Sequence, residues 1–228
     1  RDLVRSRGLG DVYKRQIGFY GSTLNTRQYA TKGYLEKLIA QVFTGRERFE
    51  PGNPQEGYSP SPQERQSWLQ ISYMKEAYHT MGPKFTLGWM AEALYSSKNF
   101  SENYTATMMQ AGEFAPTPHS KLMYNEAFRA NQYVAAGIKP IYVLNDMFQF
   151  RTEFYGFTPI FPIKKNALNK AYYGKAFSRF EYMGEVSVIC HLPFGAISAY
   201  VNHYSSPRRE WNVGMTIGWQ LFNYRFVE

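Results

Sequence analysis

The sequence has a single cysteine, Cys190, and no long run of apolar residues. One cysteine excludes an internal disulfide and any metal site built from several thiolates. No stretch approaches the roughly 18 consecutive apolar residues that a membrane-spanning helix needs. A spanning β-strand needs only about 9–11 residues, with every second one apolar. The missing apolar run therefore excludes helical membrane proteins and leaves spanning strands open.

Signatures of common catalytic sites are also missing. The sequence holds no G-x-S-x-G nucleophile elbow, no glycine-rich phosphate loop and no H-E-x-x-H zinc motif. The four histidines are widely spaced, and His191 lies on a predicted strand, where a hydrogen-bonded structural role is expected. Glu181 and Glu185 are about 13 Å apart at ~3.3 Å per residue, too far for paired acid–base work. We therefore expect no catalytic residue, metal ligand or cofactor in this chain.

Basic residues exceed acidic ones modestly, with 26 Lys and Arg against 18 Asp and Glu. Residues 1–16 hold five basic and two acidic groups, so 5 − 2 = +3 of the net charge of +8 lies there. This segment resembles the translated adapter sequence found at the ends of metagenomic reading frames, and we expect a non-native, disordered leader. No basic stripe is interleaved with aromatic residues on one element, so nucleic acid is not an expected partner.

Aromatic residues are abundant: 19 Tyr, 17 Phe and 4 Trp make up 18% of the chain. Such residues favour strands and membrane interfaces. From residue 17 onward apolar and polar residues alternate with a period of two, which predicts strands. The most regular runs are 84–96, 148–155, 179–192 and 212–221.

Weaker alternation brings the expected total to about eleven antiparallel strands. The additional runs are 34–47, 69–73 and 197–202, with shorter candidates at about 17–29, 103–111, 121–128 and 159–165. Short turns are expected at 30–33, 80–83 and 192–195, and long polar links at about 49–63 and 128–140. Outer-membrane barrels have short turns at one end and long loops at the other.

Alternation alone does not say which face meets water, because a soluble β-sandwich gives the same pattern. Strands of about 9–14 residues exceed the usual soluble length of about 5–6 residues, which favours a membrane barrel. The polar faces mix charges of both signs, as a hydrated lumen tolerates. We therefore expect an all-β fold, an antiparallel transmembrane β-barrel over residues 17–228. A soluble all-β binding protein is the alternative.

Several segments resemble the Omp85, or bacterial surface antigen, family. Residues 29–34 (YATKGY) resemble its tyrosine–proline–threonine–lysine–glycine turn, with Ala30 where proline is usual. Residues 192–195 look like its proline-containing periplasmic turn. Residues 148–159 resemble the strand after the sixth external loop, whose inward arginine and glutamate would be Arg151 and Glu153. The last strand looks like a barrel-assembly signal made of Asn212, Gly214, Ile217, Trp219 and Phe226.

Residues 120–228 resemble most the barrel that follows the patatin-like phospholipase domain in Bacteroidetes outer-membrane proteins, and more broadly BamA-like barrels. The resemblance covers the chain from about residue 17 to the end. This resemblance implies a C-terminal fragment with about 11 of sixteen strands, located in the bacterial outer membrane. It implies outer-membrane lipid and the barrel-assembly machinery as partners. Its role would be to anchor or translocate missing N-terminal domains of the same protein, the phospholipase among them. The alternative is a passive porin-like channel or structural outer-membrane protein.

The sequence departs from this family in the sixth loop, which usually carries an arginine–glycine–aromatic tip. The matching residues 128–133 (FRANQY) provide only Arg129. An arginine in a narrow lumen needs a carboxylate partner, because an unpaired buried charge is unfavourable. Glu153 or Glu181 is the expected partner, and an exposed loop arginine remains the alternative.

Overall fold

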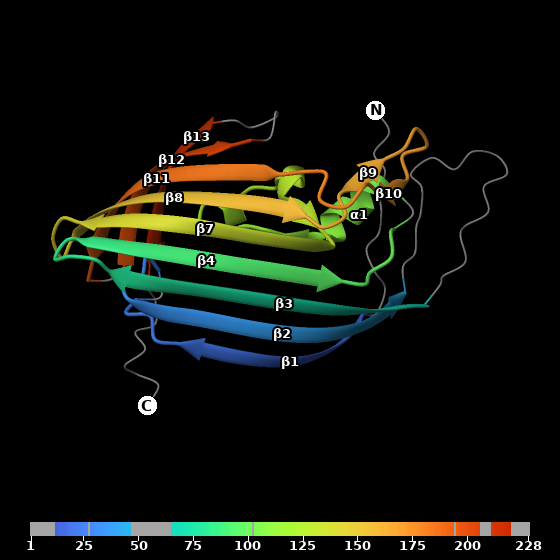
Figure 1. Ribbon diagram of the computed structural model, residues 1–228, viewed down its shortest axis with the longest axis horizontal. Coiled ribbons are helices and arrows are strands. Elements are labelled where there is room, and N and C mark those ends of the chain that lie inside the picture. Colours follow the sequence, from blue (N-terminus) through green and yellow to red (C-terminus); the bar gives the residue numbers. More distant parts are fainter. Residues whose placement is uncertain are drawn as a thin grey trace.

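The computed structural model describes residues 12–26, 28–46, 65–101, 103–193, 195–205 and 211–219. The predicted long link at 49–63 and the predicted signal residue Phe226 lie outside these ranges. Within them, most residues belong to one large sheet of nine strands (Figure 1). The strands are β1 (Tyr13–Ser22), β2 (Gly33–Arg46), β3 (Arg65–Thr80), β4 (Phe85–Ser96), β7 (Gln132–Val143), β8 (Phe148–Pro159), β11 (Glu181–Leu192), β12 (Gly195–Tyr204) and β13 (Trp211–Trp219).

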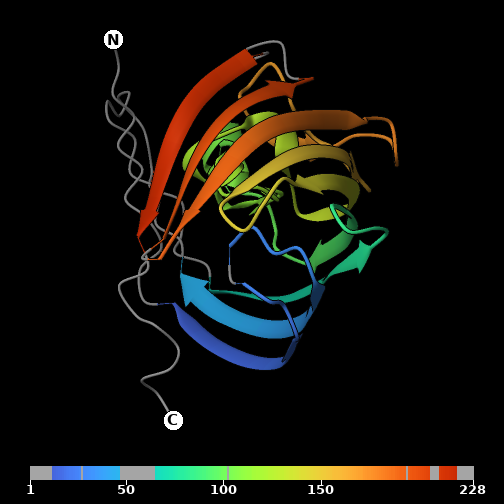
Figure 2. The same ribbon diagram turned by 90° about the vertical axis from the view of Figure 1, so that its left-hand side faces the viewer.

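The nine strands pair in sequence order, and every pair is antiparallel. The prediction of an all-β antiparallel fold is confirmed, and the described part of each of the four most regular runs lies in a strand of this sheet, apart from one or two residues at the start. The sheet curves strongly but is open, with β1 and β13 as its two edges (Figure 2). The predicted total of about eleven strands is too high for this sheet.

The alternation of the sequence separates an apolar convex face from a more polar concave face. On β8, Phe148, Phe150 and Phe154 are exposed, whereas Arg151 and Glu153 between them are buried. On β11, Val186 and Val188 are 54% and 38% exposed, whereas Glu185 and Ser187 are 3% and 2% exposed. The side chains that a soluble sandwich would bury are therefore the ones that this sheet exposes.

The 97–131 connection between β4 and β7 lies inside the curve of the sheet (Figure 2). It contains α1 (Tyr104–Gln110), the 3-10 helices η1 (Ser120–Leu122) and η2 (Glu126–Phe128), and the short pair β5 (Gly112–Glu113) and β6 (Arg129–Ala130). No helix in the described part of the chain is long and apolar enough to cross a membrane.

Two predicted strands are helical in the structure. The candidate at 103–111 is α1, because the Asn103 side chain caps the helix by accepting a 2.7 Å hydrogen bond from the Ala106 N–H. The candidate at 121–128 consists largely of 3-10 turns, the second capped by Asn125. Both predictions are wrong because short polar side chains near these segments pair with backbone N–H groups and start helical turns.

The predicted long link at 128–140 is also wrong, since most of it belongs to β7. This strand is hard to recognise in the sequence because Gly137, Lys139 and Pro140 do not favour a sheet interior. The ladder between β7 and β8 is interrupted at Lys139 and Pro140, and Pro140 has no N–H to donate. Lys139 is 3% exposed on the concave face, where its charge is paired.

Two more boundaries differ from the sequence prediction. β1 starts at Tyr13, inside the segment expected to be disordered, because residues 13–16 pair with β2 from Thr44 to Gln41. The candidate at 159–165 does not extend the large sheet. It contains β9 (Ile163–Lys165), which pairs only with β10 (Ala171–Tyr173) in a hairpin at the end of the sheet.

The concave face has an apolar zone and a polar zone. The apolar zone lies toward the end where the long connections leave, and Phe114 and Phe128 of the 97–131 connection pack there against Tyr133 and Phe157. The polar zone lies toward the short turns and holds Arg151 and most of the buried charges. The inward connection therefore buries apolar side chains of its own against one half of the concave face.

Gly137 allows β7 and β8 to pack closely. A Cβ at this position would lie 2.2 Å from Cδ1 of Tyr155 and 2.7 Å from the Phe154 carbonyl oxygen. We expect Gly137→Ala to destabilise the folded chain in detergent micelles by about 1–3 kcal/mol, the usual effect of overpacking. Chemical unfolding followed by circular dichroism measures this.

Gly184→Ala is the matched control on β11, because its Cβ would meet no atom closer than 3.5 Å. It should change the free energy of unfolding by less than about 0.5 kcal/mol. Equal destabilisation by the two alanines would contradict the close approach of β7 and β8.

Candidate functional site

The buried polar groups of the concave face form two neighbouring clusters. The ion-pair cluster consists of Glu76, Tyr78, Lys139, Arg151, Glu153 and Tyr155 from β3, β7 and β8. The latch cluster joins the β1–β2 turn, the inward 97–131 connection and the strands β11 and β12. It consists of Tyr29, Thr117, His119, Glu185 and Ser198.

Arg151 is the centre of the ion-pair cluster and is 3% exposed. Its Nε donates to Glu153 Oε1 at 2.9 Å, and its Nη1 donates to the Ala30 carbonyl oxygen at 2.9 Å. Its Nη2 lies 3.3 Å from the Tyr78 hydroxyl on β3. A single guanidinium therefore links β8 to β3 across the curve of the sheet and to the β1–β2 turn.

The remaining charges in this cluster are also paired. Lys139 Nζ donates to Glu76 Oε1 at 2.8 Å, and Glu76 also accepts from the Tyr78 hydroxyl. The Tyr155 hydroxyl donates to Glu153 Oε2 at 2.5 Å. Breaking a buried ion pair typically destabilises a protein by about 3–5 kcal/mol, so each partner holds the other in place.

The β1–β2 turn folds onto the concave side instead of projecting away from the sheet. Gln149 Nε2 donates to the Tyr29 carbonyl oxygen at 3.2 Å, next to the Ala30 carbonyl held by Arg151. Gly33 ends the turn with φ +91°, and a Cβ there would lie 2.1 Å from the Thr23 carbonyl oxygen. Glycine is therefore required at the point where the chain leaves the turn and enters β2.

The latch cluster holds the inward connection against the sheet. His119 Nδ1 lies 2.7 Å from Glu185 Oε1, and His119 Nε2 lies 3.1 Å from Ser198 Oγ. The Thr117 hydroxyl donates to Glu185 Oε2 at 3.0 Å. The Tyr200 ring stacks on the His119 ring at 3.6 Å between centroids. The His119 imidazole thus links the inward connection to β11 and β12.

The order serine, histidine, carboxylate is also that of a nucleophilic triad. Here the Tyr29 hydroxyl donates to Ser198 Oγ at 2.8 Å, and burial raises the pKa of this hydroxyl, so that it stays protonated. His119 and Ser198 are 0% and 1% exposed, which leaves a substrate no approach to the hydroxyl. A fully paired and enclosed chain of donors fits a structural latch better than a reactive centre.

Among the residues predicted from sequence, Arg151 and Glu153 lie together on the concave face as expected. Glu181 lies apart from them, and its carboxylate accepts from Arg179 Nε at 2.7 Å. In β13, Asn212 is half-buried and Ile217 is exposed. Gly214 lies against the Tyr200 ring, and a Cβ added at Gly214 would lie 2.6 Å from the Tyr200 hydroxyl oxygen. Trp219 is the last residue of the strand.

The predicted partner of Arg129 is wrong. Its Nη2 donates to Glu113 Oε2 at 2.6 Å, and its Nη1 donates to the Met109 carbonyl oxygen at 3.1 Å. Glu113 is directly opposite Arg129 in the β5–β6 pair, so a local carboxylate is already in place. The alternative of an exposed loop arginine is wrong as well, since the side chain is only 12% exposed.

Sequence reasoning missed the latch cluster almost entirely. Glu185 and Ser198 could be assigned to the polar faces of their strands, but a period of two does not say which loop residue reaches them. Thr117 and His119 lie 68 and 66 residues before Glu185, in a segment without alternation. Only the fold brings these residues together.

We expect His119→Asn to release the inward connection, because the shorter side chain leaves the Glu185 carboxylate without its imidazole partner. Trypsin should then cut after Lys121 at least about tenfold faster, since proteolysis follows local opening. Mass spectrometry of the fragments measures the rate. His203→Asn, on the convex side of β12, is the matched control and should cleave at the rate of the unchanged chain.

The latch also predicts that a fluorophosphonate probe does not label Ser198. Labelling that disappears in Ser198→Ala would contradict a structural role and identify a serine nucleophile. Equal trypsin cleavage of the two histidine variants would contradict the latch itself.

Comparison with known proteins adds no assignment to this site. No protein-family model, curated protein or solved structure matches the chain. The described residues also contain no group of three or more His, Cys, Asp or Glu side chains that could hold a metal ion.

Proposed function

We propose that this chain forms the lipid-embedded wall of an outer-membrane β-barrel whose interior is filled by its own inward connection. The observation that carries this proposal is the distribution of charge between the two faces. The convex positions of β4, β7, β8, β11 and β12 contain no Asp, Glu, Lys or Arg. The concave positions of the same strands contain several. They are Glu92, Lys139, Arg151, Glu153, Glu181 and Glu185.

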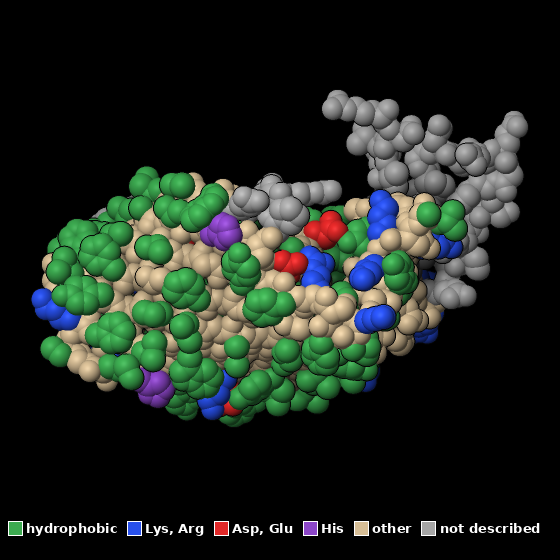
Figure 3. All heavy atoms as spheres, turned by 45° about the horizontal axis from the view of Figure 1, so that its top comes forward, with side chains coloured by type: hydrophobic (Ala, Val, Ile, Leu, Met, Phe, Trp, Pro, Cys, Tyr) green, Lys and Arg blue, Asp and Glu red, His purple; other side chains and the backbone are tan. Residues whose placement is uncertain are grey.

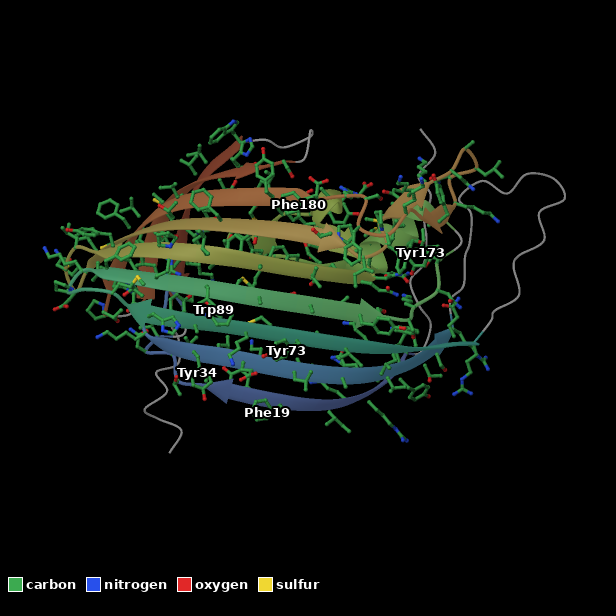
Figure 4. The ribbon with its side chains drawn as sticks, in the orientation of Figure 1. Phe19, Tyr34, Tyr73, Trp89, Tyr173 and Phe180 are labelled. Atoms are coloured by element: carbon green, nitrogen blue, oxygen red, sulfur yellow. The ribbon has the colours of Figure 1, made fainter. Side chains whose placement is uncertain are left out.

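The convex face matches the chemistry of a bilayer. Figure 4 labels Phe19, Tyr34, Tyr73 and Trp89 on four neighbouring strands, all at convex positions. Continuous exposed apolar surface of this extent is rare in a soluble monomer and is normal where lipid replaces water. The strands of this face have 9 to 16 residues, the length that a tilted spanning strand requires.

On β1, β2 and β3 the convex positions include charged residues, namely Arg15, Glu36, Arg46, Arg65 and Lys75, and two of them form an ion pair. Glu36 and Lys75 lie opposite each other on β2 and β3, with 3.6 Å between Glu36 Oε2 and Lys75 Nζ. The Tyr73 hydroxyl donates to Glu36 Oε1 at 2.7 Å. These two charges neutralise each other, which lowers the penalty of placing them beside lipid.

The interior argues against the porin-like alternative. The aromatic residues Phe114 and Phe128 of the inward connection are each 2% exposed and pack on the concave face. The latch cluster ties the same connection to β11 and β12. An open water-filled channel would require this packed segment to leave.

The open edges support a larger assembly. Among the described residues, β1 and β13 each have a partner strand on one side only, and unpaired edges are strongly unfavourable in lipid. We propose that further strands of the same protein close the barrel. The resemblance to Omp85-type barrels supports a role in anchoring or translocating an upstream domain, with a patatin-like phospholipase as the candidate.

Tryptophan fluorescence tests the membrane-facing assignment in vesicles with brominated acyl chains. A variant retaining only Trp89, on the convex face, should be quenched strongly, because its indole contacts lipid. A variant retaining only Trp68, which stacks on Phe43 on the concave side at 5.0 Å, is the matched control and should be quenched weakly.

Equal quenching of the two tryptophans in the vesicle-bound chain would contradict the proposal, because it would mean that neither face has a preference for lipid.

A further inference from the structure

The connection between β8 and β11 concentrates the positive charge of the chain. We call residues 160–180 the basic hairpin, since β9 and β10 form its centre. It has five basic and no acidic residues, so 5 − 0 = +5 of the net charge of +8 lies in this segment. The basic residues are Lys164, Lys165, Lys170, Lys175 and Arg179.

Most of this charge has no carboxylate partner among the described residues. Arg179 pairs with Glu181, with 2.7 Å between Nε and Oε1. The four lysines are exposed, and within the ranges that the structure describes none of them forms an ion pair with a carboxylate. Figure 3 shows Lys and Arg side chains gathered toward the end of the molecule that carries β9 and β10.

The lysines are carried by an ordered scaffold. Ile163 is 3% exposed and packs with Met108 and Ala111 at the α1 helix. The Tyr104 N–H donates to the Asn169 carbonyl oxygen at 2.8 Å, and Asn131 Nδ2 donates to the Tyr173 hydroxyl at 3.1 Å. The hairpin is therefore held against the inward connection, and its lysines need little ordering to bind a ligand.

Exposed apolar side chains surround the lysines. They are Phe161, Leu168, Tyr172, Phe177 and Phe180. Phe180 directly precedes β11 and lies against Gly156 on the convex side of β8. A Cβ added at Gly156 would lie 3.1 Å from the Phe180 ring. The basic hairpin therefore adjoins the apolar convex face at the end of the sheet where the long connections leave.

We propose that the basic hairpin binds the phosphate groups of anionic lipid headgroups. The proposal rests on the proposed membrane function and names the partner of one rim of the sheet. Aromatic side chains favour the headgroup level of a bilayer, and lysines near the surface attract anionic headgroups. At the rim of the apolar face the hairpin offers both, with Phe180 beside the acyl region and the lysines beyond it.

Nucleic acid fits this surface less well. Its phosphates would pair with the lysines, but the adjoining apolar convex face would stay exposed to water. A lipid headgroup satisfies both halves of the surface, because its phosphate meets the lysines while its acyl chains meet the apolar face.

The test compares the full chain with two charge-matched double variants on vesicles of phosphatidylcholine with and without phosphatidylglycerol. Lys164→Gln with Lys170→Gln removes two of the five positive charges of the hairpin. Lys32→Gln with Lys84→Gln removes the same charge at the short-turn end. Each lysine near an anionic surface contributes about a fivefold factor in binding. The hairpin variant should therefore lose at least about tenfold of the preference for anionic vesicles, and the control variant should keep it.

Three results would overturn the proposal. The unchanged chain could show no preference for anionic vesicles, or both variants could lose it equally, which would indicate net charge alone. A single-stranded oligonucleotide could also compete fully with anionic vesicles for the hairpin, which would indicate a general polyanion site. Quenching of Trp89 and Trp68 in brominated vesicles reports the lipid-facing side separately, so failure of the proposed function is distinguishable from failure of this binding site.

Discussion

The Arg151 guanidinium holds together parts of the chain that are far apart in the sequence. It contacts Glu153 on its own strand, Tyr78 on β3 and the Ala30 carbonyl oxygen in the β1–β2 turn. These groups are buried on the concave face, where each charge requires a partner. The curvature of the sheet satisfies that requirement, because it brings β3, β8 and the turn within reach of one side chain. Because the polar residues of these strands are buried on the concave face, the apolar residues that alternate with them lie on the convex face.

The sequence predicts well which residues share a face, because successive residues of a strand point to opposite faces of the sheet. Residues 148–155 alternate Phe148 and Phe150 with Gln149 and Arg151, and the structure exposes the first pair and buries the second. The inward connection could not be predicted in the same way. Its segments are fixed by Asn103 and Asn125 caps and by contacts such as His119 with Glu185, which depend on tertiary structure. β7 could not be predicted because Gly137 and Pro140 disfavour strands locally. Pairing with β4 on one side and β8 on the other overrides that preference.

The two clusters and the inward connection make the interior a filled, cross-linked space. The ion-pair cluster fixes the turn at one end, the latch cluster fixes the connection to β11 and β12, and aromatic packing around Phe114 fills the other end. Such an interior supports the sheet from within. This arrangement fits the proposed anchoring wall better than a permanently open channel, and in that proposal the basic hairpin lies at the rim where lipid and water meet.

Lipid contact of the convex face is tested most directly by nitroxide labels placed one at a time on β11. The positions are Val186, Ser187, Val188 and Ile189, each changed to cysteine in a Cys190→Ser background and studied in vesicles by power saturation. Val186 and Val188 are exposed on the convex side, whereas Ser187 and Ile189 are 2% and 0% exposed on the concave side. Lipid contact predicts high accessibility to oxygen at Val186 and Val188 and low accessibility at Ser187 and Ile189. Uniform oxygen accessibility, or high accessibility to a water-soluble nickel complex at the two valines, would contradict it.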